Sequence, residues 1–266
     1  MTIRKFLAMG AVLAAAAFAS APASADALAD IKAAGKLRVS IDLASPPNGM
    51  LDGSLKATGS DVETAELLAK DWGVELEIVQ TTGATRIPNL QTNKADIVIS
   101  TLAVTEERKQ VIDFSTPYSG QLSMVGAPAS MQLKDWADLK GKLVTVCRGT
   151  TQDVDMTKRS SEVGFTIARY DDEGAMVTAA VSGQATIVAS SEALIKQIAI
   201  KAKSQGFEPK FTIRVFDLAV GVRKNDPELL AAVNEWVAAN LKNDKLNEIY
   251  RRYHGHPLPD EIVKGK

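Results

Sequence analysis

The chain has 266 residues, and its 31 lysines and arginines nearly balance its 32 aspartates and glutamates. That balance excludes nucleic acid and anionic membrane surfaces as predicted partners, because both leave a basic footprint in the composition. The length is sufficient for one large or two small domains with a sizeable buried core.

The first 25 residues have the layout of a secretory signal peptide. Basic residues at positions 4 and 5 precede an apolar run over 6–19, and an Ala-Ser-Ala cleavage site follows at 23–25. The run is shorter than the roughly 20 apolar residues of a membrane-spanning helix, so an uncleaved anchor is the lesser alternative. Without this leader, 29 basic residues stand against 32 acidic ones, a net charge of −3.

Cysteine and histidine are scarce in this chain. Cys147 is the only cysteine, so no intramolecular disulfide is expected, and its mid-chain position rules out a lipidated N-terminal cysteine. The only histidines, His254 and His256, do not form a zinc-type spacing with it. The sequence therefore predicts a free periplasmic monomer with no metal and no cofactor.

Strand-like and helix-like segments alternate along the rest of the chain. Residues 36–43 alternate as a half-buried strand does, and 60–73 show helical spacing, with Ser60 or Asp61 as the N-cap and Gly73 at the end. The same patterns predict strands at 74–80, 95–100, 143–147, 165–170, 186–190 and 215–224, and helices at 86–94, 153–160, 173–183, 192–205, 226–243 and 245–254. This order predicts an α/β fold with largely parallel sheets.

The order of the segments also predicts two lobes. A second strand–helix series begins at residue 143, and the last two helices need a sheet to cover. We expect lobe 1 to contain 26–118 and 221–266, lobe 2 to contain 119–220, and hinge segments to lie near 118–122 and 216–220. A ligand would then bind between the lobes, at the carboxyl ends of the strands.

Three stretches carry a family resemblance: "STLAVTEERKQVIDFSTPYS" at 100–119, "DLKGKLVTVCRGTTQ" at 138–152 and "VGVRKNDPELLAAVNEWV" at 220–237. With them the chain resembles the polar amino-acid-binding proteins of ABC importers, solute-binding family 3. The most specific part is the run T-E-x-R…I-D-F-S-x-P-Y. The resemblance implies a Venus flytrap fold, in which two α/β sheets joined by a two-strand hinge close over a small ligand, and docking on a membrane permease.

The resemblance gives Arg108 a ligand-binding role. It implies a bidentate pair between this guanidinium and the α-carboxylate of the ligand, for which a planar fork of donors is well suited. Thr101 and Ala103 match positions that bind the same carboxylate. Without the resemblance, Arg108 would be interpreted as a surface residue paired with Glu106 or Asp113.

Residues from other segments complete the predicted site. Thr150 and Thr151 match a turn before a helix, whose amides suit an anion, although a plain helix cap would use the same residues. Asp42 matches an acidic position at a strand end that contacts the polar side or the ammonium of the ligand in several members. An ordinary role of Asp42 in the turn at the strand end is an alternative of equal weight.

One position near the end of the second lobe, next to Glu192, departs from the family pattern. Members usually carry an aspartate for the α-ammonium where this chain has Ser191. Either Glu192 or Asp42 supplies the negative charge, or the ligand lacks such an ammonium, because an ammonium facing only a hydroxyl is costly to bury.

Other departures bear on the ligand side chain. Ser45, Asn48 and Ser60 stand where tyrosine or phenylalanine is common, which predicts a roomier and more polar site unless these residues form loop surface. Arg86 matches a position that holds a side-chain carboxylate in members binding acidic amino acids, so Arg86 and Arg108 together would suit a dianion.

Two more charged residues near the site are expected to have ordinary roles. Arg148, before the glycine turn, is predicted to face water. Glu173 lies near a position that touches ligand side chains in some members, but it is interpreted as an acid in the first turn of a helix.

No catalytic residues are predicted, because the sequence has no nucleophile–base pair and its cysteine has no histidine nearby. The predicted function is a periplasmic solute-binding protein that captures a polar amino acid or derivative, with acidic ones among the candidates, and delivers it to an ABC importer. The alternative is an enzyme like cyclohexadienyl dehydratase, which needs only a positioned acid and carboxylate-binding arginines. A sensor that docks on a receptor would use the same lobe faces.

Overall fold

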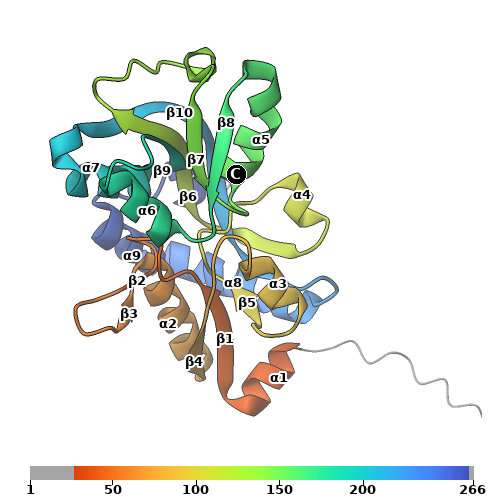
Figure 1. The fold of residues 1–266 in the computed structure, drawn as a ribbon. Coiled ribbons are helices and arrows are strands. Elements are labelled where there is room, and N and C mark those ends of the chain that lie inside the picture. The colour runs from red at the N-terminus through yellow and green to blue at the C-terminus, as the bar shows by residue number, and fades with distance from the viewer. Residues whose placement is uncertain (1–26, 264–266) are drawn as a thin grey trace, which may run out of the picture.

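A computed structural model describes residues 27–263 of the protein (Figure 1). The predicted leader over 1–25 lies outside the described residues. Within 27–263, the structure contains no helix that combines the length and the apolar character needed to span a membrane.

The described chain alternates between strands and helices, as the sequence predicted. The helices are α1 (Ala27–Ala34), α2 (Ser60–Trp72), α3 (Arg86–Gln91), α4 (Glu106–Lys109), α5 (Thr151–Val163), α6 (Glu173–Val181), α7 (Glu192–Lys201), α8 (Pro227–Lys242), α9 (Lys245–His254) and α10 (Asp260–Val263), with 3₁₀ turns at Trp136–Leu139 and Lys203–Gln205. The strands are β1 (Lys36–Ile41), β2 (Met50–Leu51), β3 (Ala57–Thr58), β4 (Glu75–Gln80), β5 (Ile97–Val98), β6 (Asp113–Pro128), β7 (Leu143–Cys147), β8 (Thr166–Tyr170), β9 (Ile187–Ser191) and β10 (Phe207–Val222).

The fold has two lobes that share one continuous ladder of strands. The order is β4-β1-β5-β10-β6-β9-β7-β8, and β2 and β3 form a separate hairpin. In lobe 1, β1 runs parallel to β4 and β5, and in lobe 2, β7 runs parallel to β8 and β9. Figure 1 shows lobe 2 with α5, α6 and α7 above, and lobe 1 with α1, α2 and α3 below.

The long strands β6 and β10 join the two parallel groups. They pair antiparallel over most of their length, with Ser119 opposite Leu218 and Gly120 opposite Asp217. The predicted hinge segments, 118–122 and 216–220, therefore lie side by side in this ladder. The sequence predicted a crossing strand at each hinge segment, but the full length of β6 was not predicted, because serines, glycines and prolines interrupt the alternation of 113–128.

Helices cover both faces of the lobe 2 strands. Met156 of α5 packs with Val144 and Val146 on one face, while Met176 of α6 and Leu194 of α7 pack in a separate cluster on the other. A sheet buried on both faces needs apolar residues on both sides of each strand. This explains the short continuous apolar runs of lobe 2.

The N-terminus of α2 differs from the sequence prediction. The N-cap is Gly59, with no side-chain cap bond, rather than Ser60 or Asp61. The Asp61 carboxylate is buried and accepts hydrogen bonds from two other segments, so it is not available to cap the helix. The predicted end is confirmed, because Gly73 closes α2 in the left-handed conformation with φ 68°.

The lobe 1 core gives a stability prediction. Leu68 of α2 is fully buried in the cluster that contains β1, so Leu68→Ala is expected to lower the free energy of unfolding by about 2–5 kcal/mol through lost burial and a residual cavity. Urea denaturation measures this. The control is Leu143→Ala, at a side chain that is 54% exposed, and it should lower the free energy of unfolding by well under half as much. An equal loss of stability at both positions would contradict the packing described.

Candidate ligand-binding site

Arg108 reaches from one lobe to the other. It lies in the single turn α4, where the Thr105 hydroxyl caps the helix by accepting a hydrogen bond from the Arg108 amide (3.2 Å). Its Nη1 donates to the Ala103 carbonyl (2.9 Å), and its Nη2 donates to the Gly149 carbonyl (3.2 Å), which follows β7 in lobe 2. The guanidinium therefore bridges the carboxyl ends of strands from both lobes.

The surface alternative for Arg108 is wrong. Glu106 pairs with Lys109 (2.8 Å) and Asp113 with Lys224 (2.6 Å), and both pairs are exposed or half-buried. Each carboxylate already has a lysine partner, so neither is the partner of Arg108.

Arg108 has no ion-pair partner among residues 27–263. Burial, and secondly the nearby cation Arg86, lower its pKa to about 9. Two backbone carbonyls are weaker partners than a carboxylate, because charge-assisted pairs of Arg with an anion are shorter and roughly twice as strong. Arg108 is therefore bound by two carbonyls and by no carboxylate within 27–263.

Arg86 is the second buried guanidinium. It begins α3, is 4% exposed, and its Nη1 donates to the Ser100 carbonyl (2.6 Å), with the Thr101 carbonyl and hydroxyl at 3.5 and 3.4 Å. Its Nε has no hydrogen-bond partner in the described chain. Burial lowers the pKa of Arg86, and the carboxylates of Glu173 and Asp42 oppose that shift.

A buried hydrogen-bond network, which the sequence did not predict, holds Thr101 in place. Thr101 has a φ of 45°, and its amide donates to Asp61 Oδ2 (2.8 Å). Asp61 Oδ1 accepts from the Tyr118 hydroxyl (2.8 Å), at the start of the long strand β6. The Thr101 amide is thus already satisfied, and the network holds the bend between β5 and α4 in place.

Asp42 and Glu173 face each other from opposite lobes. Asp42, after β1, is 5% exposed and accepts from the Ala44 amide (2.9 Å), so its turn role is confirmed. Glu173 is the first residue of α6, is 9% exposed, and hydrogen bonds with Ser45 of lobe 1. Its Oε2 has no partner in the described chain. Glu173 is therefore in a first helical turn, as predicted, but it is buried between the lobes.

We call the contact formed by Asp42, Gly83, Arg86, Arg108, Gly149 and Glu173 the seam. Its two backbones touch: a Cβ built on Gly83 would lie 2.9 Å from the Arg148 carbonyl oxygen, and one on Gly149 would lie 2.7 Å from the Ala84 Cα. Gly149 also has a φ of 75°, which favours glycine. The absence of side chains at these two positions is what allows the lobes to approach so closely.

Thr150 and Thr151 lie at the lobe 2 side of the seam. Thr150 is the N-cap of α5, where its hydroxyl accepts from the Asp153 amide (3.2 Å) and donates to the Cys147 carbonyl (2.7 Å). Thr151 is buried, and its hydroxyl donates to Gln152 Oε1 (3.3 Å). The cap function is confirmed, and an anion-binding function of these threonines stays a prediction.

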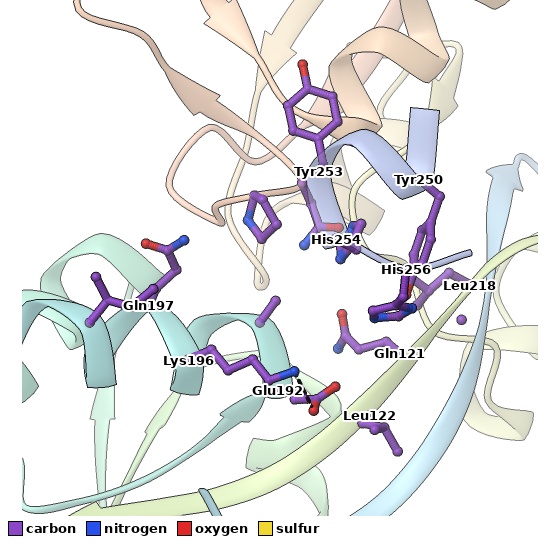
Figure 2. A pocket seen from close by; sticks show the side chains of 15 residues that line it. Gln121, Leu122, Glu192, Lys196, Gln197, Leu218, Tyr250, Tyr253, His254 and His256 are labelled. Carbon is purple, nitrogen blue, oxygen red and sulfur yellow. Dashed lines mark ion pairs between the residues drawn. The ribbon is translucent and has the colours of Figure 1, made fainter. Parts of the chain in front are cut away.

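Ser191 and Glu192 do not place a free carboxylate in the seam. Ser191 is the N-cap of α7, with its hydroxyl accepting from the Leu194 amide (3.2 Å). Glu192 pairs with Lys196 one turn later (2.8 Å). Figure 2 shows this pair at a different cavity, which lies between α7, the strand β6 and the helix α9.

The cavity of Figure 2 has a volume of about 200 Å³. Among its lining residues are Asn48, Glu192, Tyr250 and His254, and none of the seam residues lines it. Asn48 accepts from the Ser60 hydroxyl (3.2 Å), beneath this cavity. Ser45, another of the polar positions predicted to widen the ligand site, contacts Glu173 of the seam.

The comparisons identify the family. The profile of the bacterial extracellular solute-binding proteins, family 3, matches residues 37–256, which is most of the chain. The protein therefore belongs to that family. The two-lobed α/β architecture described above is the fold of its structural neighbours.

Named relatives agree with this assignment. The chain is 28% identical to the L-cystine-binding protein TcyJ of Escherichia coli, over 85% of each chain. A crystal structure of an ArgBP mutant from T. maritima matches with a TM-score of 0.80 and 30% identity, over 86% of this chain and 100% of the other. The ancestral amino acid-binding protein AncCDT-1, a precursor of cyclohexadienyl dehydratase, matches with a TM-score of 0.76 and 30% identity, over 85% and 99%.

The close backbone approach at the seam gives a second prediction. Gly83→Ala is expected to hold the lobes apart, because the new Cβ would meet the Arg148 carbonyl oxygen and Thr150 Cγ2 of the other lobe at 2.9 and 3.1 Å. Small-angle X-ray scattering in a mixture of L-amino acids should show a larger radius of gyration than for the wild type. Gly53→Ala, where a Cβ would meet nothing within 4 Å, is the control, and an unchanged radius for Gly83→Ala would contradict this account.

Proposed function

We propose that the protein is the periplasmic binding component of an ABC importer, and that it captures a polar amino acid or derivative and delivers it to a membrane permease. The observation that carries this proposal is the partly buried guanidinium of Arg108, which spans both lobes and contacts carbonyls but no carboxylate. The family and the names of the relatives support it. We further propose that the protein works as a monomer, exported with the loss of residues 1–25.

The proposed mechanism is closure of the lobes over the ligand. With the seam open, the ligand carboxylate takes the place of the Gly149 carbonyl as a partner of Arg108 and forms a bidentate pair. The closed state is favoured because only there do both lobes contact the ligand. We assign the motion to the segments 118–122 and 216–220, between lobe 1 (26–118 and 221–266) and lobe 2 (119–220).

Arg86 bears on whether the side chain of the ligand is acidic. An acidic side chain would be bound by this guanidinium, whose Nε has no partner in the described chain. Arg86 also lies near Glu173 and Asp42. These two carboxylates would repel the side-chain carboxylate of an acidic ligand unless a cation paired with them. We propose a polar amino acid in general and an acidic one as the narrower candidate.

One observation favours the enzymatic alternative. Burial, followed by the charge of Asp42, raises the pKa of Glu173 to about 7, and a buried acid of this kind beside two arginines has the form of a general acid. The relationship to AncCDT-1 points the same way. We nevertheless propose binding, because the named relatives of this chain are amino-acid-binding proteins.

Removal of Arg108 tests the proposed function. In a thermal-shift screen of the twenty L-amino acids, the wild type should be stabilised by about 2.7 kcal/mol at one hundred times the dissociation constant. Arg108→Ala should abolish that shift, because each charge-assisted hydrogen bond lost is worth roughly 1.5–3 kcal/mol. A comparison of glutamate with glutamine in the same screen tests the acidic candidate.

The matched control for that screen is Arg148→Ala. Arg148 is 52% exposed and pairs with the exposed Asp171 at 2.9 Å, as predicted for a side chain that faces water. This variant should keep the full ligand-induced shift. A normal shift in Arg108→Ala, or no shift with any amino acid in the wild type, would overturn the proposed function.

The enzymatic alternative has its own test. If the protein only binds its ligand, as proposed, purified protein incubated with prephenate or arogenate should leave both compounds unchanged. Loss of the substrate absorbance, measured against a protein-free sample, would replace the binding proposal by the dehydratase one.

A further inference from the structure

Two groups of opposite charge in the seam are incompletely paired in the described chain. Arg108 contributes a cation from lobe 1 that contacts only carbonyls. Glu173 contributes a carboxyl group from lobe 2, nine-tenths buried, with Oε2 unpartnered. An unpaired buried charge is expensive, so a molecule that completes both groups needs a negative end and a positive end.

The carboxylates around Glu173 strengthen this pattern. Asp42 faces it from the end of β1, and Asp172 precedes it as the N-cap of α6. Arg86 is the cation that faces it, and Cys147 of β7 lies close enough for Glu173 to raise the pKa of its thiol. The carboxylates of Asp42 and Glu173 thus both lie near Arg86 on this side of the seam, with Asp172 next to Glu173, and a second cation would offset part of their negative charge.

The residues suggested by the sequence do not supply that negative charge. Ser191 is neutral, and its hydroxyl caps α7. Glu192 is paired with Lys196 and lines the cavity of Figure 2 instead of the seam. Glu173 is the carboxyl group in the described chain that is both buried in the seam and unpartnered at one oxygen.

We propose that Glu173, assisted by Asp42, binds the ammonium group of the ligand across the seam, so that the protein selects molecules carrying both a carboxylate and an amine. This inference rests on the proposed function and deepens it. Arg108 and Glu173 then hold the two ends of one zwitterion from opposite lobes, which couples recognition of the amine to closure. Simple carboxylic acids are excluded because they leave Glu173 without a partner.

The proposal has a pH consequence with a definite sign. Glu173 must be ionised to bind an ammonium, whereas burial raises its pKa in the ligand-free protein to about 7. Binding below that pH therefore requires the loss of a proton, and affinity should weaken about tenfold between pH 8 and pH 6. If Glu173 instead stayed protonated and donated to a ligand carboxylate, affinity would strengthen as the pH falls.

The experiment measures dissociation constants by calorimetry at pH 6, 7 and 8. The probes are the twenty L-amino acids and three partners that lack the amine: propionate for alanine, succinate for aspartate and glutarate for glutamate. Wild-type protein should bind at least one amino acid with the stated pH slope and none of the three acids at comparable affinity.

Variants separate Glu173 from its neighbours. Glu173→Gln should weaken binding at pH 8 more than tenfold and remove the pH slope, and Glu173→Asp should retain part of both. Glu162→Gln, an exposed change in α5, should leave both unchanged. Thermal melts of the ligand-free variants confirm that they fold, which is expected since Glu173→Gln removes an uncompensated buried charge.

The outcomes distinguish the two proposals. If no amino acid binds the wild type, the proposed function fails and this inference fails with it. If amino acids bind but Glu173→Gln keeps the affinity and the pH slope, only the assignment of Glu173 is overturned. The same conclusion follows if Glu192→Gln, and not Glu173→Gln, loses the affinity and the pH slope. Equal binding of succinate, glutarate or propionate would likewise overturn the inference alone.

Discussion

The hydrogen bond from Arg108 to the Gly149 carbonyl is the contact on which the organisation of the site depends (3.2 Å). It joins a short helix of lobe 1 to the turn that opens α5 in lobe 2. A guanidinium withdrawn from water but bound only to carbonyls keeps much of its charge uncompensated. The seam is therefore held together by a group that would bind an anion more strongly than a carbonyl, and the proposed function assigns the response to a ligand to this contact.

The polar network under the seam explains why Arg108 points where it does. Asp61 ties the Thr101 amide to the Tyr118 hydroxyl, and Arg86 ties α3 to the Ser100 carbonyl. Such buried networks specify one arrangement when their members are satisfied. Because Tyr118 begins the segment predicted as a hinge, the same network connects the bend that carries Arg108 to the strands that join the lobes.

Local patterns were reliable where short-range physics decides the outcome. The strand at 143–147 and the helix end at Gly73 were predicted correctly, because side-chain periodicity and the left-handed preference of glycine act within a few residues. For the strand over 113–128, the sequence predicted a crossing near 118–122 but not the full extent. Its stability comes from pairing with β10, ninety or so residues later in the chain, and such long-range pairing leaves no local signal.

The sequence by itself determined the family and the alternation of strands and helices, because a motif and a periodicity are properties of neighbouring residues. Only the tertiary structure decided which carboxylates share the seam. Asp61 is a network residue and not a helix cap, Glu173 is buried against Ser45, and Glu192 faces another cavity. Charge pairing and burial depend on which residues meet in space, and here those residues are far apart in the chain, 57 positions for Asp61 and Tyr118 and more than one hundred for Glu173 and Ser45.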